Sequence, residues 1–208
     1  MKTWTKKDLM LSAKVLSAIF TPFYLPVLGI VILLFFSYLN ILPMMYKIMI
    51  LFIIFIFTVL LPTALIGFYR KYCGLTHFQL SIRHRRIVPY ILSCLCYLCC
   101  VYIMKALHAP HFVTTMVLTA LIVQLVCALI NVWWKISTHM AAVGGVTGAL
   151  MGFSMIFIFN PLWWFCLLMI ISGILGTARI ILRQHTLAQI VAGFLISTVM
   201  SFLLVIIL

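Results

Sequence analysis

Seven runs of about 20 predominantly apolar residues dominate this chain, and they constrain its fold more than any motif does. They cover residues 15–39, 44–68, 88–107, 112–134, 139–159, 162–182 and 187–208. About 20 such residues in a helix cross the hydrocarbon core of a bilayer, and a spanning segment must satisfy its own backbone hydrogen bonds. Only 7% of the residues are charged, too few for the surface of a soluble domain. The sequence therefore predicts an all-α, polytopic membrane helix bundle of about six or seven transmembrane helices.

The amino terminus differs in character from the rest of the chain. Residues 1–14 are basic and amphipathic, which predicts an interfacial segment, and residues 15–208 are expected to form a single membrane-embedded helical domain. The apolar run that follows residue 14 is too long for the hydrophobic region of a signal peptide and has no convincing cleavage site. We therefore expect an uncleaved protein integral to the cytoplasmic (inner) membrane.

Acidic side chains are nearly missing from the sequence. Fourteen Lys and Arg stand against one Asp or Glu, which is Asp8. This excludes paired-carboxylate hydrolysis, carboxylate-held metal ions and Ser-His-Asp triads. The seven cysteines include a CLCYLCC run that is typical of packing inside an apolar helix. We expect no metal and no cofactor, and any chemistry must use His, Arg, Lys, Ser and backbone groups.

The remaining polar residues collect on one membrane face. Each span moves the chain to the other side, so 69–87, 134–139 and 183–187 share the face of the amino terminus. Cations that converge in a membrane protein indicate a functional site. The candidate anion ligands on this face are Arg83, Arg86, Lys135 and Arg179, and the helix expected to begin near His139 would point free N–H groups at the same place.

These clusters, in this order, resemble the type 2 phosphatidic acid phosphatase superfamily, which is related to vanadium haloperoxidases. That family carries Lys-x6-Arg-Pro, then Pro-Ser-Gly-His, then Ser-Arg-x5-His-x3-Asp. The third element here runs from Ala178-Arg179 to His185 and Gln189 with the spacing intact, and the second reads Ile136-Ser137-Thr138-His139. The first is the most divergent, because two residues separate Arg86 from Pro89. The phosphatase-like core covers about 75–195.

The resemblance implies a metal-independent phosphoric monoester or diphosphate hydrolase. It would be an integral membrane lipid phosphatase or phosphotransferase, acting on a lipid phosphate or a polyprenyl diphosphate through a phosphohistidine intermediate. By resemblance, His185 is the nucleophile and His139 protonates the leaving oxygen. The phosphate would be held by Arg179, Arg86, Arg83, Lys135, Ser137 and Thr138. Gln189 replaces the family Asp; its carbonyl can accept the ring N–H of His185 but supplies no charge.

Two other functions remain open. The chain could be a non-catalytic anionic-lipid binder or carrier that retains the phosphate pocket, or a channel or transporter subunit. Its expected partners are the lipid substrate and membrane lipids, with no nucleic acid, and its oligomeric state is open. Twelve of the 14 Lys and Arg fall on the shared face, so the positive-inside rule places the site in the cytoplasm. The family more often works on the outer face, and we follow the charges.

Overall fold

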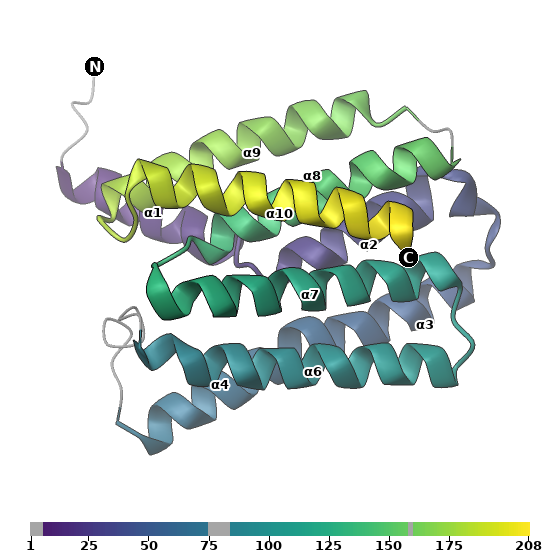
Figure 1. The fold of residues 1–208 in the computed structure, drawn as a ribbon, viewed down its shortest axis with the longest axis horizontal. Helices are drawn as coiled ribbons and strands as arrows, with labels where there is room; N and C mark the ends of the chain where they lie inside the picture. Colours follow the sequence, from purple (N-terminus) through teal and green to yellow (C-terminus); the bar gives the residue numbers. More distant parts are fainter. Residues whose placement is uncertain (1–5, 75–83, 158–159) are drawn as a thin grey trace.

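A computed structural model describes residues 6–74, 84–157 and 160–208, and these form a bundle of long apolar helices (Figure 1). The helices are α1 (Lys6–Ile19), α2 (Tyr24–Phe36), α3 (Met44–Phe55), α4 (Leu61–Tyr72), α6 (Ile87–Ala106), α7 (His111–Trp133), α8 (Thr138–Phe157), α9 (Leu162–Ile181) and α10 (Leu187–Ile207), with short 3-10 segments at Tyr38–Ile41 and His84–Arg86. Six helical stretches in the described residues are long and apolar enough to cross a membrane. This confirms the predicted all-α membrane bundle.

The first predicted span, 15–39, is not a single helix. It is divided between α1 and α2, which meet at an angle of 57°. Pro22 lies in the break, has no N–H to donate, and disfavours helical geometry at the residue before it. Pro26 is tolerated because it lies in the first turn of α2. The chain therefore bends at residues 20–23, whereas α1 passes through residue 14 without interruption.

A second proline shapes the following span. α3 and α4 join through a π-helical turn at Ile56–Leu60, which ends two residues before Pro62. A proline inside a helix removes one backbone hydrogen bond and crowds the carbonyl four residues earlier, and a wider π turn relieves that crowding. The hydroxyl of Thr58 bonds back to the Ile54 carbonyl at 2.8 Å. The span continues without a break from Met44 to Tyr72.

Glycines bring α8 and α10 into close contact. A Cβ at Gly144 would lie 2.3 Å from the backbone oxygen of Phe194, and one at Gly148 would lie 2.0 Å from that of Thr198. Only residues without a side chain allow two helix backbones to approach this closely. The residue numbers of the contacting pairs increase together along both helices, so α8 and α10 run parallel. Their amino termini therefore lie at the same end of the bundle.

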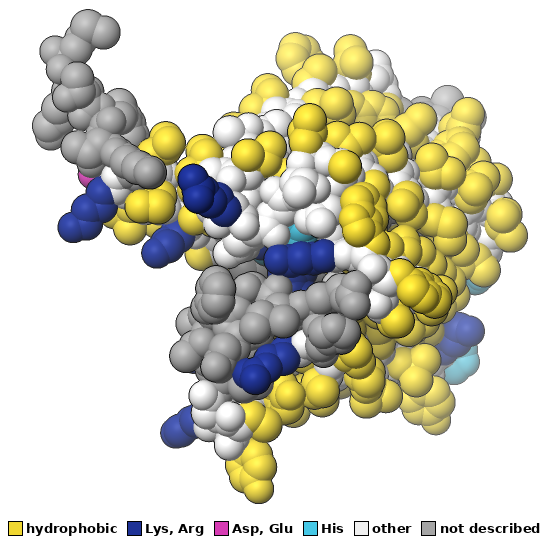
Figure 2. Space-filling view, turned by 60° about the vertical axis from the view of Figure 1, so that its left-hand side comes forward, with side chains coloured by type: hydrophobic (Ala, Val, Ile, Leu, Met, Phe, Trp, Pro, Cys, Tyr) yellow, Lys and Arg dark blue, Asp and Glu magenta, His cyan; other side chains and the backbone are white. Residues whose placement is uncertain are grey.

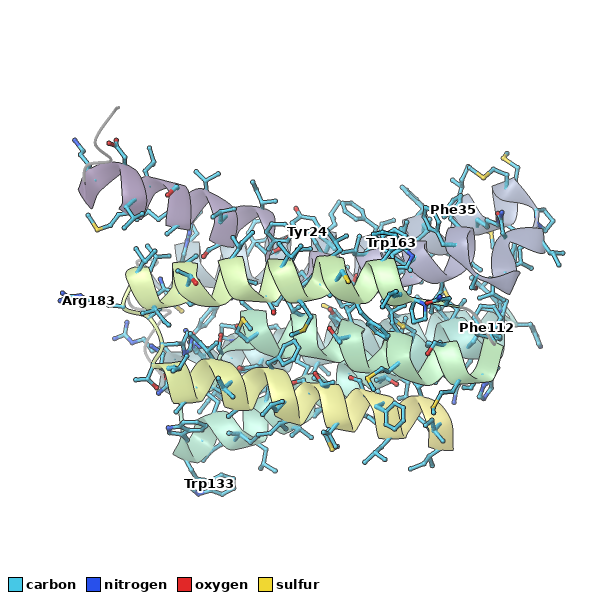
Figure 3. The ribbon with its side chains drawn as sticks, turned by 90° about the horizontal axis from the view of Figure 1, so that it is seen from above. Tyr24, Phe35, Phe112, Trp133, Trp163 and Arg183 are labelled. Carbon is cyan, nitrogen blue, oxygen red and sulfur yellow. The ribbon has the colours of Figure 1, made fainter. Side chains whose placement is uncertain are left out.

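That end also holds the start of α6 and the turn between α9 and α10 (Figure 1, left). Arg183 projects outward from the turn, and Trp133 lies at the same end (Figure 3). Viewed toward this end, Lys and Arg side chains gather with histidine atoms visible between them, while hydrophobic side chains cover the flanks (Figure 2). The described parts of the three polar loops thus share one end, as the alternation of spans predicts.

Candidate functional site

Five of the predicted site residues come together at this end of the bundle. His185 lies close enough to interact electrostatically with Arg86, Arg179 and Lys135. His139 interacts in the same way with Arg179, His185 and Arg86. These five residues come from four separate parts of the chain, and the sole carboxylate side chain, Asp8, is exposed on α1. The structure therefore builds a cluster of three cations and two imidazoles, which we call the cation cluster.

His185 is held by the first turn of α10. The Gln189 Oε1 accepts a hydrogen bond from the Thr186 backbone N–H at 3.2 Å, and the Thr186 hydroxyl accepts one from the Gln189 N–H at 3.4 Å. This capping box fixes the Gln189 carbonyl as an acceptor. The same Oε1 lies 3.1 Å from His185 Nδ1, so Nδ1 must carry the proton. The lone pair of His185 is therefore on Nε2, which is buried and unbonded within the described structure.

The surroundings keep His185 neutral. Its side chain is only 6% exposed. Burial, followed by the charges of Arg86 and Arg179, lowers the pKa of His185 to about 3, although the bond to Gln189 acts in the opposite direction. At neutral pH this residue presents an unprotonated nitrogen among positive charges. That is the state in which an imidazole can attack an electrophile.

His139 is fixed from a different direction. Its Nε2 lies 3.3 Å from the backbone oxygen of Ser17, in the last turn of α1. A carbonyl oxygen can only accept, so Nε2 donates and the proton is on that nitrogen. Nδ1 of His139 is buried and has no hydrogen-bond partner among the described residues. The two histidines thus each use one nitrogen for positioning and leave the other free for a ligand.

The cations of the cluster are partly withdrawn from water. Arg179, in the last turn of α9, is 6% exposed and its Nε has no partner in the described structure. Arg86 precedes α6. Burial lowers the pKa of Arg86, and the nearby Tyr90 offsets part of this decrease. Burial and the charges of Arg86 and Arg179 lower the pKa of Lys135. Buried cations without carboxylates are costly, and a bound anion would supply the missing countercharge.

The chain turns sharply after α9, and this turn brings His185 back beside Arg179. Arg183 has a positive φ of 51°, and the N–H groups of Arg183 and Gln184 bond back to the Ile180 and Arg179 carbonyls. This is a left-handed helix end of the kind usually formed by glycine or asparagine. Arg183 is exposed and points away from the bundle (Figure 3). It therefore stays outside the cation cluster although it lies near His185 in sequence.

The remaining predicted ligands have different outcomes. Ser137 is fully buried just before α8, and its hydroxyl has no partner within the described residues. Thr138 is the first residue of α8 and lines a cavity beside His139. Arg83 lies outside the described residues. The second sequence element thus supplies a hydroxyl, a helix start and a histidine at one place.

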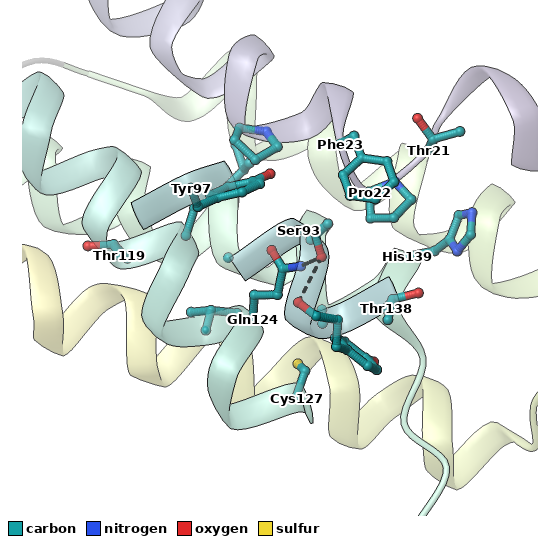
Figure 4. A pocket seen from close by; sticks show the side chains of 18 of the residues that line it. Thr21, Pro22, Phe23, Ser93, Tyr97, Thr119, Gln124, Cys127, Thr138 and His139 are labelled. Carbon is teal, nitrogen blue, oxygen red and sulfur yellow. Dashed lines mark hydrogen bonds between the residues drawn. The ribbon is translucent and has the colours of Figure 1, made fainter. Parts of the chain in front are cut away.

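A cavity of about 470 Å³ lies inside the bundle beside the cation cluster, and of the five cluster residues Arg86 and His139 line it. Arg86, Thr138 and His139 line one end, and the remaining lining comes from the break between α1 and α2 and from α2, α4, α6, α7, α8 and α10. Figure 4 shows His139 beside Thr21 and Pro22 of the break, with Tyr97 and Gln124 deeper inside. Most of the lining is apolar. The site therefore combines a cationic end with a mainly hydrophobic interior.

Two contributors were not predicted from the sequence. One is the Ser17 carbonyl, which reaches His139 only because α1 ends at the break. The other is Tyr90, which lies one helical turn beyond Arg86 and has a buried hydroxyl with no partner in the described structure. The spacing from Arg86 could have indicated Tyr90, because residues four apart share a helix face. No local signal indicated Ser17.

Comparison with family models, curated proteins and solved structures finds no match to this chain. Among the described residues, no three His, Cys, Asp or Glu side chains gather as a metal ion would require. The fold and the cation cluster therefore carry the functional argument by themselves.

Proposed function

We propose that this chain is an integral membrane lipid phosphatase or phosphotransferase that acts on a lipid phosphate or a polyprenyl diphosphate. The observation that carries the proposal is the pair of histidines in the cation cluster, each with one nitrogen positioned and the other open. His185 Nε2 supplies a nucleophile, and Arg86, Arg179 and Lys135 supply fixed positive charge for the phosphoryl oxygens. The sole Asp or Glu of the sequence is Asp8, which is exposed on α1.

In the proposed reaction, the Nε2 lone pair of His185 forms a bond to phosphorus and the bond from phosphorus to the lipid oxygen breaks. The departing oxygen takes a proton from Nδ1 of His139, to which the bound phosphate monoanion can first deliver it. Water, or an acceptor alcohol in a phosphotransferase, then attacks the phosphohistidine and gives its proton to His139 Nδ1, which passes it on to the phosphate product as the bond from phosphorus to His185 Nε2 breaks. Both histidines return to their starting states.

The alternative is a non-catalytic binder or carrier of anionic lipids. One observation favours it: Gln189 positions His185 with a neutral carbonyl, so no negative charge stabilises the imidazolium that forms during phosphoryl transfer. The cations would still hold a phosphate group. The two functions share one binding site and differ only in turnover.

We also propose that the site faces the cytoplasm. Among the described basic residues, only Lys47 and Lys105 lie near the opposite end of the bundle, and the positive-inside rule places the richer side in the cytoplasm. Cys73 is exposed just after α4, on the side of the site. A variant that retains only Cys73 should resist a membrane-impermeant thiol reagent in intact cells and react after permeabilisation. Labelling in intact cells would place the site outside.

The test of the enzyme is phosphate release by the purified protein in detergent, screened over phosphatidate, phosphatidylglycerol phosphate and polyprenyl diphosphates. We expect release from at least one substrate and an acid-labile phosphoprotein on brief incubation. His185→Asn should abolish both, whereas His108→Asn, an exposed histidine at the other end, should not. Tight lipid binding with no release in wild type and no effect of His185→Asn would instead establish the binder.

A further inference from the structure

Helix α1 presents an exposed surface that combines lysines with apolar side chains. Lys7, Leu11 and Lys14 follow one another at spacings of four and three residues, so they share one face of the helix, and all three are exposed. Val15 and Ile19 are exposed as well and extend the apolar part. The projecting part of the molecule carries both Lys or Arg and hydrophobic side chains (Figure 2). We call these five residues the α1 surface.

The rest of the protein holds α1 by a narrow face. Between residues 7 and 19 only Ala13 and Ser17 are buried, and α1 packs mainly against α9. Two small side chains bury little apolar area, so this packing contributes little to holding the helix. The 57° break separates α1 from α2, so α2 does not continue the helix and fix its direction. Whatever binds the exposed side of α1 therefore helps to decide its position.

The last turn of α1 positions His139. The last carbonyls of a helix lack an intrahelical N–H partner, so the Ser17 oxygen can accept a hydrogen bond from a side chain. His139 Nε2 donates to it at 3.3 Å. Ser17 lies only three residues beyond Lys14, and the backbone bonds of the helix make the two residues move together. A displacement of α1 would take the acceptor away from Nε2 and free the tautomer that leaves the lone pair on Nδ1.

Anionic lipid headgroups fit the α1 surface. A helix with lysines beside apolar side chains binds a lipid surface through its buried apolar area and through attraction to anionic lipids. Lysine stems lie along apolar groups while their ammonium groups reach the headgroups. The six apolar spans already place the chain in a bilayer, so lipid adjoins α1. A second copy of this chain would instead bring like charges together, because α1 holds three lysines and one aspartate.

We propose that α1 binds anionic lipid headgroups and that this binding holds the Ser17 carbonyl against His139. Lipid binding by α1 stands on its own. Its consequence for phosphoryl transfer rests on the proposed function, in which His139 is the proton donor. One lysine near an anionic surface strengthens binding by about fivefold, so Lys7 and Lys14 together should favour the bound position of α1 by roughly twentyfold.

The first measurement needs no turnover. The full chain is reconstituted in vesicles of phosphatidylcholine alone and of phosphatidylcholine mixed with phosphatidylglycerol. A spin label is attached at Leu11→Cys in a variant that lacks the four cysteines that are not buried, which are Cys73, Cys94, Cys99 and Cys166. Phosphatidylglycerol should protect the label from a water-soluble nickel chelate. High salt should remove this protection, because the lysines are exposed and their attraction to lipid is screened.

The second measurement is phosphate release in the same two kinds of vesicle by the chain with its native cysteines. Phosphatidylglycerol should speed release by about three- to twentyfold in wild type, because more molecules then hold His139 in place. In Lys7→Gln/Lys14→Gln, both the label protection and the rate should be equal in the two kinds of vesicle. The matched control is Arg70→Gln/Lys71→Gln, which removes two cations from the last turn of α4 at the same end and should respond as wild type does.

The two measurements separate the parts of the proposal. Label protection that ignores phosphatidylglycerol, or that both double variants lose equally, would overturn the α1 surface as the lipid site. Protection that depends on Lys7 and Lys14, in an enzyme whose rate does not change, would overturn the link through Ser17 to His139. A protein that releases no phosphate from any substrate contradicts the proposed function, and the label still decides whether α1 binds anionic lipid.

Discussion

Replacing Gln189 with Glu tests most directly how the Gln189 side chain acts on His185. Glu has the same length as Gln, so its carboxylate can keep both contacts now made by Oε1, to the Thr186 N–H at 3.2 Å and to His185 Nδ1 at 3.1 Å. Glu is also favoured at this position of a capping box and near a helix amino terminus. The substitution therefore adds one negative charge beside the ring with little change in geometry.

The size of the effect follows from the bond that gains charge. Hydrogen bonds to charged groups contribute about 1.5–3 kcal/mol, against roughly 1 kcal/mol for neutral ones. The difference corresponds to a rise of about one pKa unit for His185. The pKa would move up from about 3 but stay well below 7, so the nucleophile remains neutral at rest. The positive charge that develops on His185 in the transition state would be stabilised by the same amount, which predicts about tenfold faster phosphoryl transfer.

Two measurements check this prediction. NMR titration of labelled histidine should show the raised pKa, and phosphate release should show the faster rate. Gln184→Glu is the matched control, since it places the same charge in the same turn without the bond to His185. A rate that rises equally in both variants would show that general electrostatics matter and that the Gln189 contact does not. An unchanged His185 pKa in Gln189→Glu would refute the assigned bond.

Three further predictions concern stability. Gly148→Ala should lower the free energy of unfolding by about 1–3 kcal/mol, because its Cβ would lie 2.0 Å from a backbone oxygen of α10. Gly173→Ala, which has open space around it, should not lower it. Thermal unfolding in detergent compares the two variants. The pKa of His185, about 3, lies below the roughly 6.5 of a free imidazole. The contribution of His185 to the free energy of unfolding is therefore complete above about pH 6.5 and is lost as the pH falls toward 3. Acid unfolding should show a slope of up to about 1.4 kcal/mol per pH unit there, and a smaller one in His185→Gln. Lys47→Met should cost about 1–3 kcal/mol by removing hydrogen bonds of 2.9 and 2.6 Å to Asn40, without weakening phosphate binding at the opposite end.

The sequence predicted the ends of a span well where the thickness of the bilayer alone sets the length of the helix. For the last five spans the predicted ends lie within two residues of the observed helices, because the apolar length needed to cross a bilayer leaves little freedom. The first predicted span is a bent pair of helices and not one continuous helix, because hydropathy does not register the missing N–H of Pro22. Pro22 favours a break in the helix, but the prediction followed the uninterrupted apolar run and did not include that break.

The site was predictable in its membership and not in its details. Alternation of spans placed Arg86, Lys135, Arg179 and His185 on one face, and the spacing of His185 and Gln189 predicted their contact. The role of the Ser17 carbonyl depends on the angle between α1 and α2, and the cavity depends on how several helices pack. Both are tertiary properties, which no local pattern encodes.

Three cations held together without a carboxylate make the fold itself sensitive to its buffer. Any anion that binds the native state and not the unfolded one raises the apparent stability, by about 2.7 kcal/mol at a hundred times its dissociation constant. The same protein should therefore melt at different temperatures in chloride, sulfate and phosphate at equal ionic strength. The ranking of those temperatures would measure the anion preference of the site before any substrate is known.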